Sequence, residues 1–141
     1  MESKASAVWT GGLKDGKGQV STDSGVLKDV SYTFASRFEK RVGTSPEELI
    51  AAAHASCFSM ALSGELGKVG INPESIRTTD TVTLAKTEAG MTVVSSHLDT
   101  VVKAPGADEL KFLSAAEAAR AGCPISRLLK ADITLSAKLE Q

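Results

Sequence analysis

The first third of the chain alternates apolar and polar residues in short runs separated by glycine-containing turns. The runs are Ala7–Trp9, Gly18–Ser21 and Tyr32–Phe38, and Gly11-Gly12 separates the first two. Alternation with a period of two is typical of half-buried β-strands. We therefore expect three short strands here. In the third strand, Arg37 would lie on the face opposite the aromatic side chains.

The clearest local signal is a helix start at Thr44–Glu48, which holds two hydroxyl residues, a proline and two glutamates. Hydroxyls cap helices, proline suits the first turn, and carboxylates match the positive end of the helix dipole. We expect a helix to about Leu66. Its apolar stretch, Ile50–Leu62, is about thirteen residues, whereas a bilayer span needs roughly twenty. The pattern favours a buried helix and no contact with a membrane.

Two long strand-like segments follow, Ser75–Lys86 and Met91–Lys103, and the short link between them ends at Gly90. Such a link predicts an antiparallel hairpin. A second helix is expected over Asp108–Ala121, stopping near Gly122.

Cys123-Pro124 then predicts a new helical turn through Leu129, and Ala131–Leu139 predicts a last strand. This order lacks strict βαβ alternation, so we expect an α+β fold with a long central helix and a second helix packed on an antiparallel sheet. About half of Ala51–Leu62 suits an interior position on every side. In so small a domain this predicts a second subunit that covers the helix, hence a homodimer.

Composition and charge narrow the choice of function. The chain has 141 residues with 42% hydrophobic residues, and we expect one domain over 1–141. A formal charge of -1 and the lack of a basic run argue against nucleic acid as a partner. The N-terminus lacks an apolar signal core, and two cysteines are too few for a secreted disulfide scaffold. A cytoplasmic location with free thiols is therefore expected.

The two cysteines are the main candidates for chemistry. Cys57 lies mid-helix, too far from the helix start for the dipole to lower its pKa much, so it would need a nearby cation. Cys123 directly precedes a first-turn proline, near exposed backbone N–H groups, and on local grounds looks the more acidic. Free cysteines in an inert core are an equally good interpretation at this point. His54 and His97 lack the paired spacing of zinc ligands, so no metal is expected.

His54 lies three residues before Cys57 and could form a thiolate–imidazolium pair with it, as in cysteine hydrolases. The favoured alternative is a packed histidine that hydrogen-bonds a backbone carbonyl. Glu47 is explained by the helix start alone, and an arginine such as Arg37 is usually a solvated charge.

Three blocks of sequence together resemble the osmotically inducible protein C (OsmC) and organic hydroperoxide resistance family, most closely its OsmC branch. They are Arg37-Phe38, Gly43–Leu62 and Ala121–Ser126. The likeness extends over nearly the whole chain, including Gly18–Val26 and Lys130–Leu135. The combination of proline, glutamate, alanine-rich helix and cysteine is specific, whereas Gly-Cys-Pro alone would be weak.

The resemblance implies an intertwined homodimer and a thiol peroxidase that reduces organic hydroperoxides, and hydrogen peroxide more weakly, in oxidative or osmotic stress defence. No metal or cofactor is implied. Carried onto this chain, the peroxidatic cysteine is Cys57, the resolving cysteine is Cys123, and Arg37 and Glu47 stabilise the thiolate. This assignment makes Cys57 the reactive thiol, whereas the local sequence alone favoured Cys123 as the more acidic one. An external dithiol would restore the enzyme, and the family likeness favours a lipoyl-bearing protein over thioredoxin.

An apolar wall for alkyl hydroperoxides would come from residues that flank these positions, although an ordinary core role explains them equally well. They are Phe38, Phe58, Met60 and Ile125. Two rival functions remain: a cysteine hydrolase that uses Cys57 and His54, and a non-catalytic redox sensor or small-ligand carrier.

Overall fold

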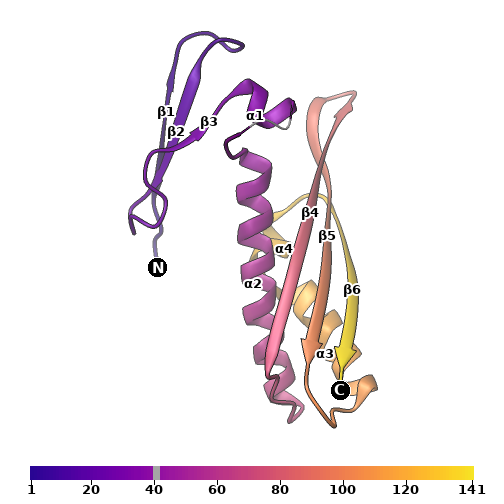
Figure 1. The fold of residues 1–141 in the computed structure, drawn as a ribbon. Coiled ribbons are helices and arrows are strands. Elements are labelled where there is room, and N and C mark those ends of the chain that lie inside the picture. The colour runs from indigo at the N-terminus through magenta and orange to yellow at the C-terminus, as the bar shows by residue number, and fades with distance from the viewer. Residues whose placement is uncertain (40–41) are drawn as a thin grey trace. The chain divides into compact units, whose positions relative to one another are not determined.

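The computed structural model describes residues 1–39 and 42–141 (Figure 1). They form two compact units, Met1–Leu49 and Ile50–Gln141, and the long helix α2 (Pro46–Lys68) passes from the first into the second. The helix predicted at this point is confirmed: it begins at Pro46, and the Ser45 hydroxyl accepts a hydrogen bond from the Glu48 backbone N–H. The expectation of one domain over 1–141 stays a prediction.

The first unit is built on a small antiparallel sheet. Its strands β1 (Ala5–Thr10), β2 (Lys17–Thr22) and β3 (Val30–Tyr32) pair in the order β1-β2-β3. Gly18 lies directly against Tyr32, where an added Cβ would come within 2.3 Å of the phenol ring. Only glycine therefore fits this position of β2.

The predicted strand Tyr32–Phe38 is wrong beyond Tyr32, because Phe34–Phe38 forms the short helix α1. Its start is a capping box in which Thr33 and Ser36 exchange side-chain and backbone hydrogen bonds. The aromatic residues that suggested a period of two instead lie one helical turn apart, with the Phe34 and Phe38 ring centroids separated by 4.8 Å. Both a strand and a helix are compatible with this spacing of aromatic residues, and the capping box stabilises the helix.

The second unit contains a three-stranded sheet in the order β4-β5-β6. Strands β4 (Ser75–Thr87) and β5 (Gly90–Lys103) form the predicted antiparallel hairpin. Strand β6 (Asp132–Glu140) is parallel to β5, so the sheet is mixed and not wholly antiparallel. The reason is the connection through α3 (Glu109–Gly122) and α4 (Pro124–Leu128), a helical crossover that returns the chain in the same direction.

The core of the second unit lies between the sheet and helices α2 and α3. One stripe of α2 is buried at every fourth residue, starting with the polar side chain of His54. The strand β5 and helix α3 provide the opposing apolar surface. Its largest members are Phe58, Leu62 and Leu66 from α2, Leu98 and Val102 from β5, and Phe112 from α3.

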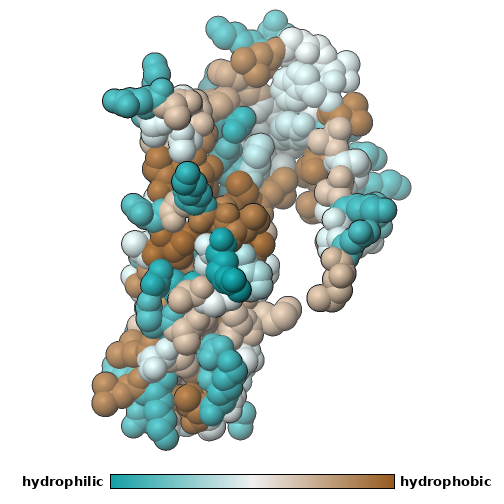
Figure 2. All heavy atoms as spheres, turned by 180° about the vertical axis from the view of Figure 1, so that it is seen from behind, coloured by the Kyte–Doolittle hydropathy of each residue, from teal (hydrophilic) through white to brown (hydrophobic). Residues whose placement is uncertain are grey.

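The rest of α2 is less buried than its composition predicts. Met60 is 78% exposed, and Ala52, Ala53 and Ser56 are exposed as well. Figure 2 shows apolar side chains gathered in patches on the outside of the second unit. Helix α2 is long and apolar enough to cross a membrane, with a mean hydropathy of 1.3 over its most apolar part. Core helices of soluble proteins meet the same two criteria. The expectation of no membrane contact stays a prediction.

Helix α3 offers a matched pair of substitutions to test this core. Phe112 is fully buried, whereas Leu110 in the same helix is 79% exposed. We expect Phe112→Ala to lower the free energy of unfolding by about 3–5 kcal/mol, because it removes buried surface and leaves a cavity. Leu110→Ala should change it by less than about 0.5 kcal/mol. Denaturant titration of both variants checks this, and equal losses would contradict the assigned core.

Candidate active site

The two cysteines of the second unit lie in contact. Cys57 comes from the middle of α2, and Cys123 is the residue between α3 and α4, where its extended backbone carries the chain from one helix into the next. Pro124 follows in the first turn of α4, as predicted. Both side chains are free thiols, and their Sγ atoms are 2.9 Å apart.

The two thiols differ in access. Cys123 is fully buried in the core, whereas Cys57 is partly exposed. Cys57 lines a cavity of about 500 Å³ whose walls are mostly apolar side chains. The lining residues are Ala53, Ser56, Cys57, Met60, Ala61, Pro124 and Ile125. A small molecule that enters this cavity therefore meets the sulfur of Cys57.

The surroundings of Cys57 within the second unit favour the neutral thiol. Burial raises the pKa of Cys57, and the hydrogen bond with Cys123 raises it further. A hydrogen bond from the backbone N–H of Ile125 acts in the opposite direction but does not outweigh them. Sequence reasoning placed the N–H groups of this turn beside Cys123, but the structure directs one of them to Cys57. A thiolate at Cys57 would still need a positive charge.

Arg37 and Glu47 form an ion pair in the first unit. The Arg37 Nη2 lies 2.6 Å from Glu47 Oε1, and the Arg37 Nε donates to both carboxylate oxygens at 3.2 Å. The pair joins α1 to the first turn of α2 and leaves the Arg37 side chain 36% exposed. Several simultaneous hydrogen bonds fix the plane of a guanidinium as well as its position.

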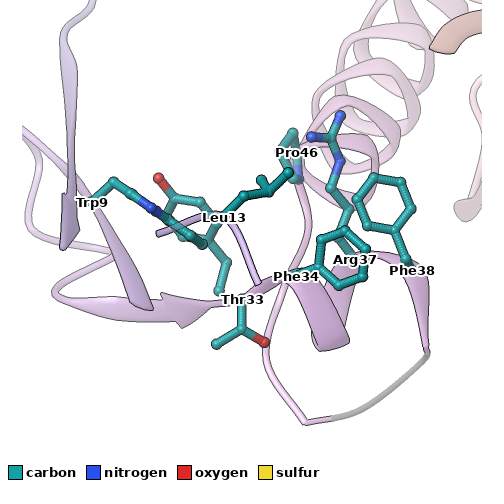
Figure 3. A pocket seen from close by; sticks show the side chains of 8 residues that line it. Trp9, Leu13, Thr33, Phe34, Arg37, Phe38 and Pro46 are labelled. Carbon is teal, nitrogen blue, oxygen red and sulfur yellow. The ribbon is translucent and has the colours of Figure 1, made fainter. Parts of the chain in front are cut away.

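The Arg37 side chain also lines an aromatic cavity of about 280 Å³ in the first unit (Figure 3). Its Cζ lies 5.1 Å from the centre of the Phe38 ring, within the range of a cation–π contact. The other lining residues are Trp9, Leu13, Tyr32, Thr33, Phe34, Phe38 and Pro46. Of these side chains, the sequence indicated only Phe38 as part of an apolar wall. Phe34 lies one helical turn before it in α1, whereas Trp9 and Tyr32 come from β1 and β3.

The four predicted site residues thus form two pairs: Arg37 with Glu47, and Cys57 with Cys123. Of the predicted apolar wall, Phe38 lines the cavity beside Arg37, and Met60 and Ile125 line the cavity beside Cys57. Phe58 is fully buried in the core, so it lines neither cavity. For Phe58 the ordinary core interpretation is correct.

His54 has other hydrogen-bond partners than the one predicted. Both ring nitrogens of the buried His54 are occupied by serine hydroxyls, Ser96 at 2.6 Å and Ser126 at 2.7 Å, instead of the expected backbone carbonyl. This arrangement leaves no ring nitrogen for the thiolate–imidazolium pair with Cys57. His97 lies within hydrogen-bond distance of Thr134 and Ser136. Within residues 1–39 and 42–141, no cluster of His, Cys, Asp and Glu side chains could hold a metal ion.

Comparison with known proteins identifies the family. The model of the OsmC family, described as OsmC-like protein, matches residues 38–138. The chain is 50% identical over 140 residues to Peroxiredoxin OsmC of Escherichia coli (strain K12), covering 99% of this chain and 98% of that protein. This chain belongs to the OsmC family.

Solved structures of OsmC and organic hydroperoxide resistance proteins share the fold. The OhrB protein of Bacillus subtilis matches with a TM-score of 0.68 and 27% identity, covering 97% of this chain and 98% of that chain. An OsmC-like protein of Mycoplasma pneumoniae matches with a TM-score of 0.79 and 14% identity, covering 100% and 99%. The α+β fold expected from the order of helices and strands is confirmed.

Proposed function

We propose that this chain is a thiol-dependent peroxidase that reduces hydroperoxides, with Cys57 as the peroxidatic and Cys123 as the resolving cysteine. The observation that carries the proposal is one accessible thiol in contact with one buried thiol, 2.9 Å apart. Full-length similarity to Peroxiredoxin OsmC supports the same activity. A cysteine hydrolase would need neither the second thiol nor its closeness.

The first step is attack of the Cys57 thiolate on the O–O bond of the hydroperoxide. A new S–O bond forms, the O–O bond breaks, and the alkoxide takes up a proton and leaves as the alcohol. Sulfur is oxidised to the sulfenic acid and the hydroperoxide is reduced. The apolar side chains around Cys57 favour the alkyl part of an organic hydroperoxide over hydrogen peroxide.

The second step forms the disulfide. The Cys123 sulfur attacks the sulfenic sulfur of Cys57, the S–O bond breaks, and the hydroxyl group leaves as water with the thiol proton. The two sulfur atoms, already 2.9 Å apart, need only approach to about 2.0 Å. No large movement of either helix is required.

An external dithiol then reduces the disulfide. Cys57 carries the more exposed sulfur, so the dithiol attacks there and releases Cys123 as a thiolate that takes up a proton. The second thiol of the donor then displaces Cys57 and leaves as a cyclic or intramolecular disulfide. On family likeness the donor is a lipoyl-bearing protein in the cytoplasm, in preference to thioredoxin.

Arg37 provides the cation that the Cys57 thiolate needs, and Glu47 holds its guanidinium in position. A positive charge near Cys57 opposes the effect of burial, which raises its pKa. The same guanidinium has hydrogen-bond donors with which to polarise the hydroperoxide. The ion pair with Glu47 fixes the guanidinium by three hydrogen bonds.

A homodimer provides the simplest way to bring this cation to the thiol. Glu47 precedes Cys57 by ten residues of one continuous helix, a rise of about 15 Å along α2. We therefore propose that Arg37 and Glu47 of one subunit act on Cys57 of the other. The exposed small and apolar side chains of α2 supply a surface that a second subunit can cover.

The two cysteines should respond differently to substitution. Cys57→Ser should abolish turnover with an organic hydroperoxide, whether a lipoyl-bearing protein or thioredoxin is the donor. Cys123→Ser should still allow one oxidation, leaving Cys57 as sulfenic acid or in more oxidised forms. Mass spectrometry after substoichiometric peroxide checks this. Sulfenic acid on Cys123 in the Cys57→Ser variant, formed at the wild-type rate, would reverse the assignment. A wild type that oxidises without sustained turnover would instead indicate a sensor.

Removing the Arg37 charge should raise the pKa of Cys57. Arg37→Ala removes the cation that opposes the effect of burial, so the thiolate should form at higher pH and its oxidation at neutral pH should slow by at least about tenfold. Ultraviolet thiolate titration in the Cys123→Ser background measures the pKa. Arg77→Ala, which removes an exposed arginine of β4, is the charge-matched control. An unchanged pKa in Arg37→Ala would remove Arg37 from the site.

Mixing two inactive variants tests the shared site. In a heterodimer of Cys57→Ser and Arg37→Ala subunits, one site receives an intact Arg37 and an intact Cys57 if the site is shared. We expect each heterodimer to regain about half of the wild-type activity per dimer. Native mass spectrometry confirms subunit exchange. Absence of recovery in exchanged dimers would place both residues of a site in the same chain.

A further inference from the structure

A chain of buried hydrogen bonds lies beside the two cysteines and takes no part in the steps above. His54 of α2 is fully buried, with Nδ1 2.6 Å from the Ser96 hydroxyl of β5 and Nε2 2.7 Å from the Ser126 hydroxyl of α4. Ser96 in turn donates to the Asp80 carboxylate of β4 at 2.8 and 2.7 Å. The Asp80 side chain is also fully buried, and its Oδ2 lies 3.3 Å from His54 Nδ1.

The order of donors and acceptors in this chain fixes the histidine tautomer. A carboxylate only accepts, so the single hydroxyl proton of Ser96 goes to Asp80. Ser96 must then accept from His54, which places a proton on Nδ1. In the neutral ring Nε2 is left as an acceptor that faces the hydroxyl of Ser126. The sheet thus orients the imidazole toward α4.

The His54–Ser126 hydrogen bond connects the same two segments as the contact between the cysteines. His54 and Cys57 are three residues apart on α2, so they project from neighbouring positions of one side. Cys123 and Ser126 are also three residues apart, at the N-cap and third position of α4. The two contacts therefore run side by side, 2.7 Å between N and O and 2.9 Å between the sulfur atoms.

The His54–Ser126 hydrogen bond is one of the tertiary contacts that hold α4, together with the packing of Ile125 against the core. Helix α4 is only five residues long, and its N-cap residue, Cys123, makes no capping hydrogen bond through its side chain. A helix this short is not stable on its own and takes its position from tertiary contacts. A buried hydrogen bond is directional, and breaking it would leave a polar atom without a partner in the core.

We propose that His54 and Ser126 are positioning residues for disulfide formation. This inference rests on the proposed function, in which Cys123 resolves the Cys57 sulfenic acid. Their hydrogen bond holds α4 so that the Cys123 sulfur stays within reach of Cys57 after the first step. Two reactions compete for the sulfenic acid: condensation with Cys123, which releases water, and a second hydroperoxide molecule, which gives sulfinic acid and alcohol. The His54–Ser126 bond favours the first.

Ser126→Ala tests the proposal by removing the hydroxyl from α4. Reduced protein is treated with excess organic hydroperoxide without a donor, and mass spectrometry measures the ratio of disulfide to sulfinic acid. We expect this ratio to fall about tenfold, the effect of losing one hydrogen bond of ordinary net strength. Ser126→Thr, which keeps a hydroxyl, should stay within about twofold of wild type. So should Ser59→Ala, which removes a different hydroxyl bond of α2, to Thr78 at 2.8 Å.

The first chemical step separates positioning from a general loosening of the fold. In the Cys123→Ser background, Ser126→Ala should slow the formation of sulfenic acid on Cys57 by far less than about tenfold. A small slowing would come from the Ile125 backbone N–H of α4, which lowers the pKa of Cys57. Substitutions of His54 give a second test if Ser126→Ala does not fold. Glutamine reaches the place of Nε2 and can bond Ser126, whereas asparagine reaches only the place of Nδ1. His54→Asn should therefore lower the ratio about tenfold relative to His54→Gln.

The outcomes distinguish this inference from the proposed function. Wild-type protein that forms no disulfide between Cys57 and Cys123 would overturn the proposed function itself. A normal disulfide in wild type with an unchanged ratio in Ser126→Ala would overturn only the positioning role. An equal slowing of the first step would also overturn it, because the defect would then be general.

Discussion

Burial of one stripe of α2 against the β4-β5-β6 sheet and α3 determines where both sulfur atoms lie. The stripe recurs at every fourth residue, and Cys57 is one position before its member Phe58. This phase of the helix leaves Cys57 at the edge of the core, partly exposed. The same core encloses Cys123 completely. Burying large side chains such as Phe58 and Leu62 contributes about 1.5–3 kcal/mol each, so the position of the thiols is as stable as the core itself.

The position at the edge of the core places two opposing demands on Cys57. In the proposed mechanism, Cys57 meets an alkyl hydroperoxide among apolar side chains, which requires a shielded sulfur. The same shielding raises the pKa of Cys57 and disfavours the reactive thiolate. In the proposed site, the Arg37 guanidinium held by Glu47 lowers the pKa of Cys57 again. This explains why the proposed site requires the Arg37–Glu47 pair as well as the two thiols.

Most elements could be predicted from the sequence because their signals are local. The start of α2 carries hydroxyl, proline and acidic residues, and the β4–β5 hairpin follows from two long strand-like segments. Helix α1 was missed because Phe34 and Phe38 fit two periods, and only the hydrogen bonds of Thr33 and Ser36 select the helix. The direction of β6 was missed because a strand pattern carries no information about its neighbour.

For the candidate site, too, local features could be predicted from the sequence and long-range contacts could not. The family resemblance proposed all four site residues, and the structure shows the ion pair and the thiol contact as separate pairs. The partners of His54 could not be found from spacing, since Asp80, Ser96 and Ser126 come from three distant elements. The hydrogen bonds among these side chains depend on the register of the sheet and on the position of α4. Such long-range polar contacts are a product of the tertiary fold.

In the proposed cycle, the oxidation state of the two cysteines would also change the stability of the second unit. A bond between Cys57 and Cys123 would close a loop whose ends are 66 residues apart. Restricting the unfolded chain to that extent is worth about 4 kcal/mol in the chain-entropy account of crosslinks. The oxidised enzyme would therefore resist unfolding and proteolysis, and each reduction by a donor would return the protein to its more fragile form. The oxidised protein, which cannot reduce a hydroperoxide until a donor has reduced it, would thus be the form that is more resistant to unfolding and proteolysis.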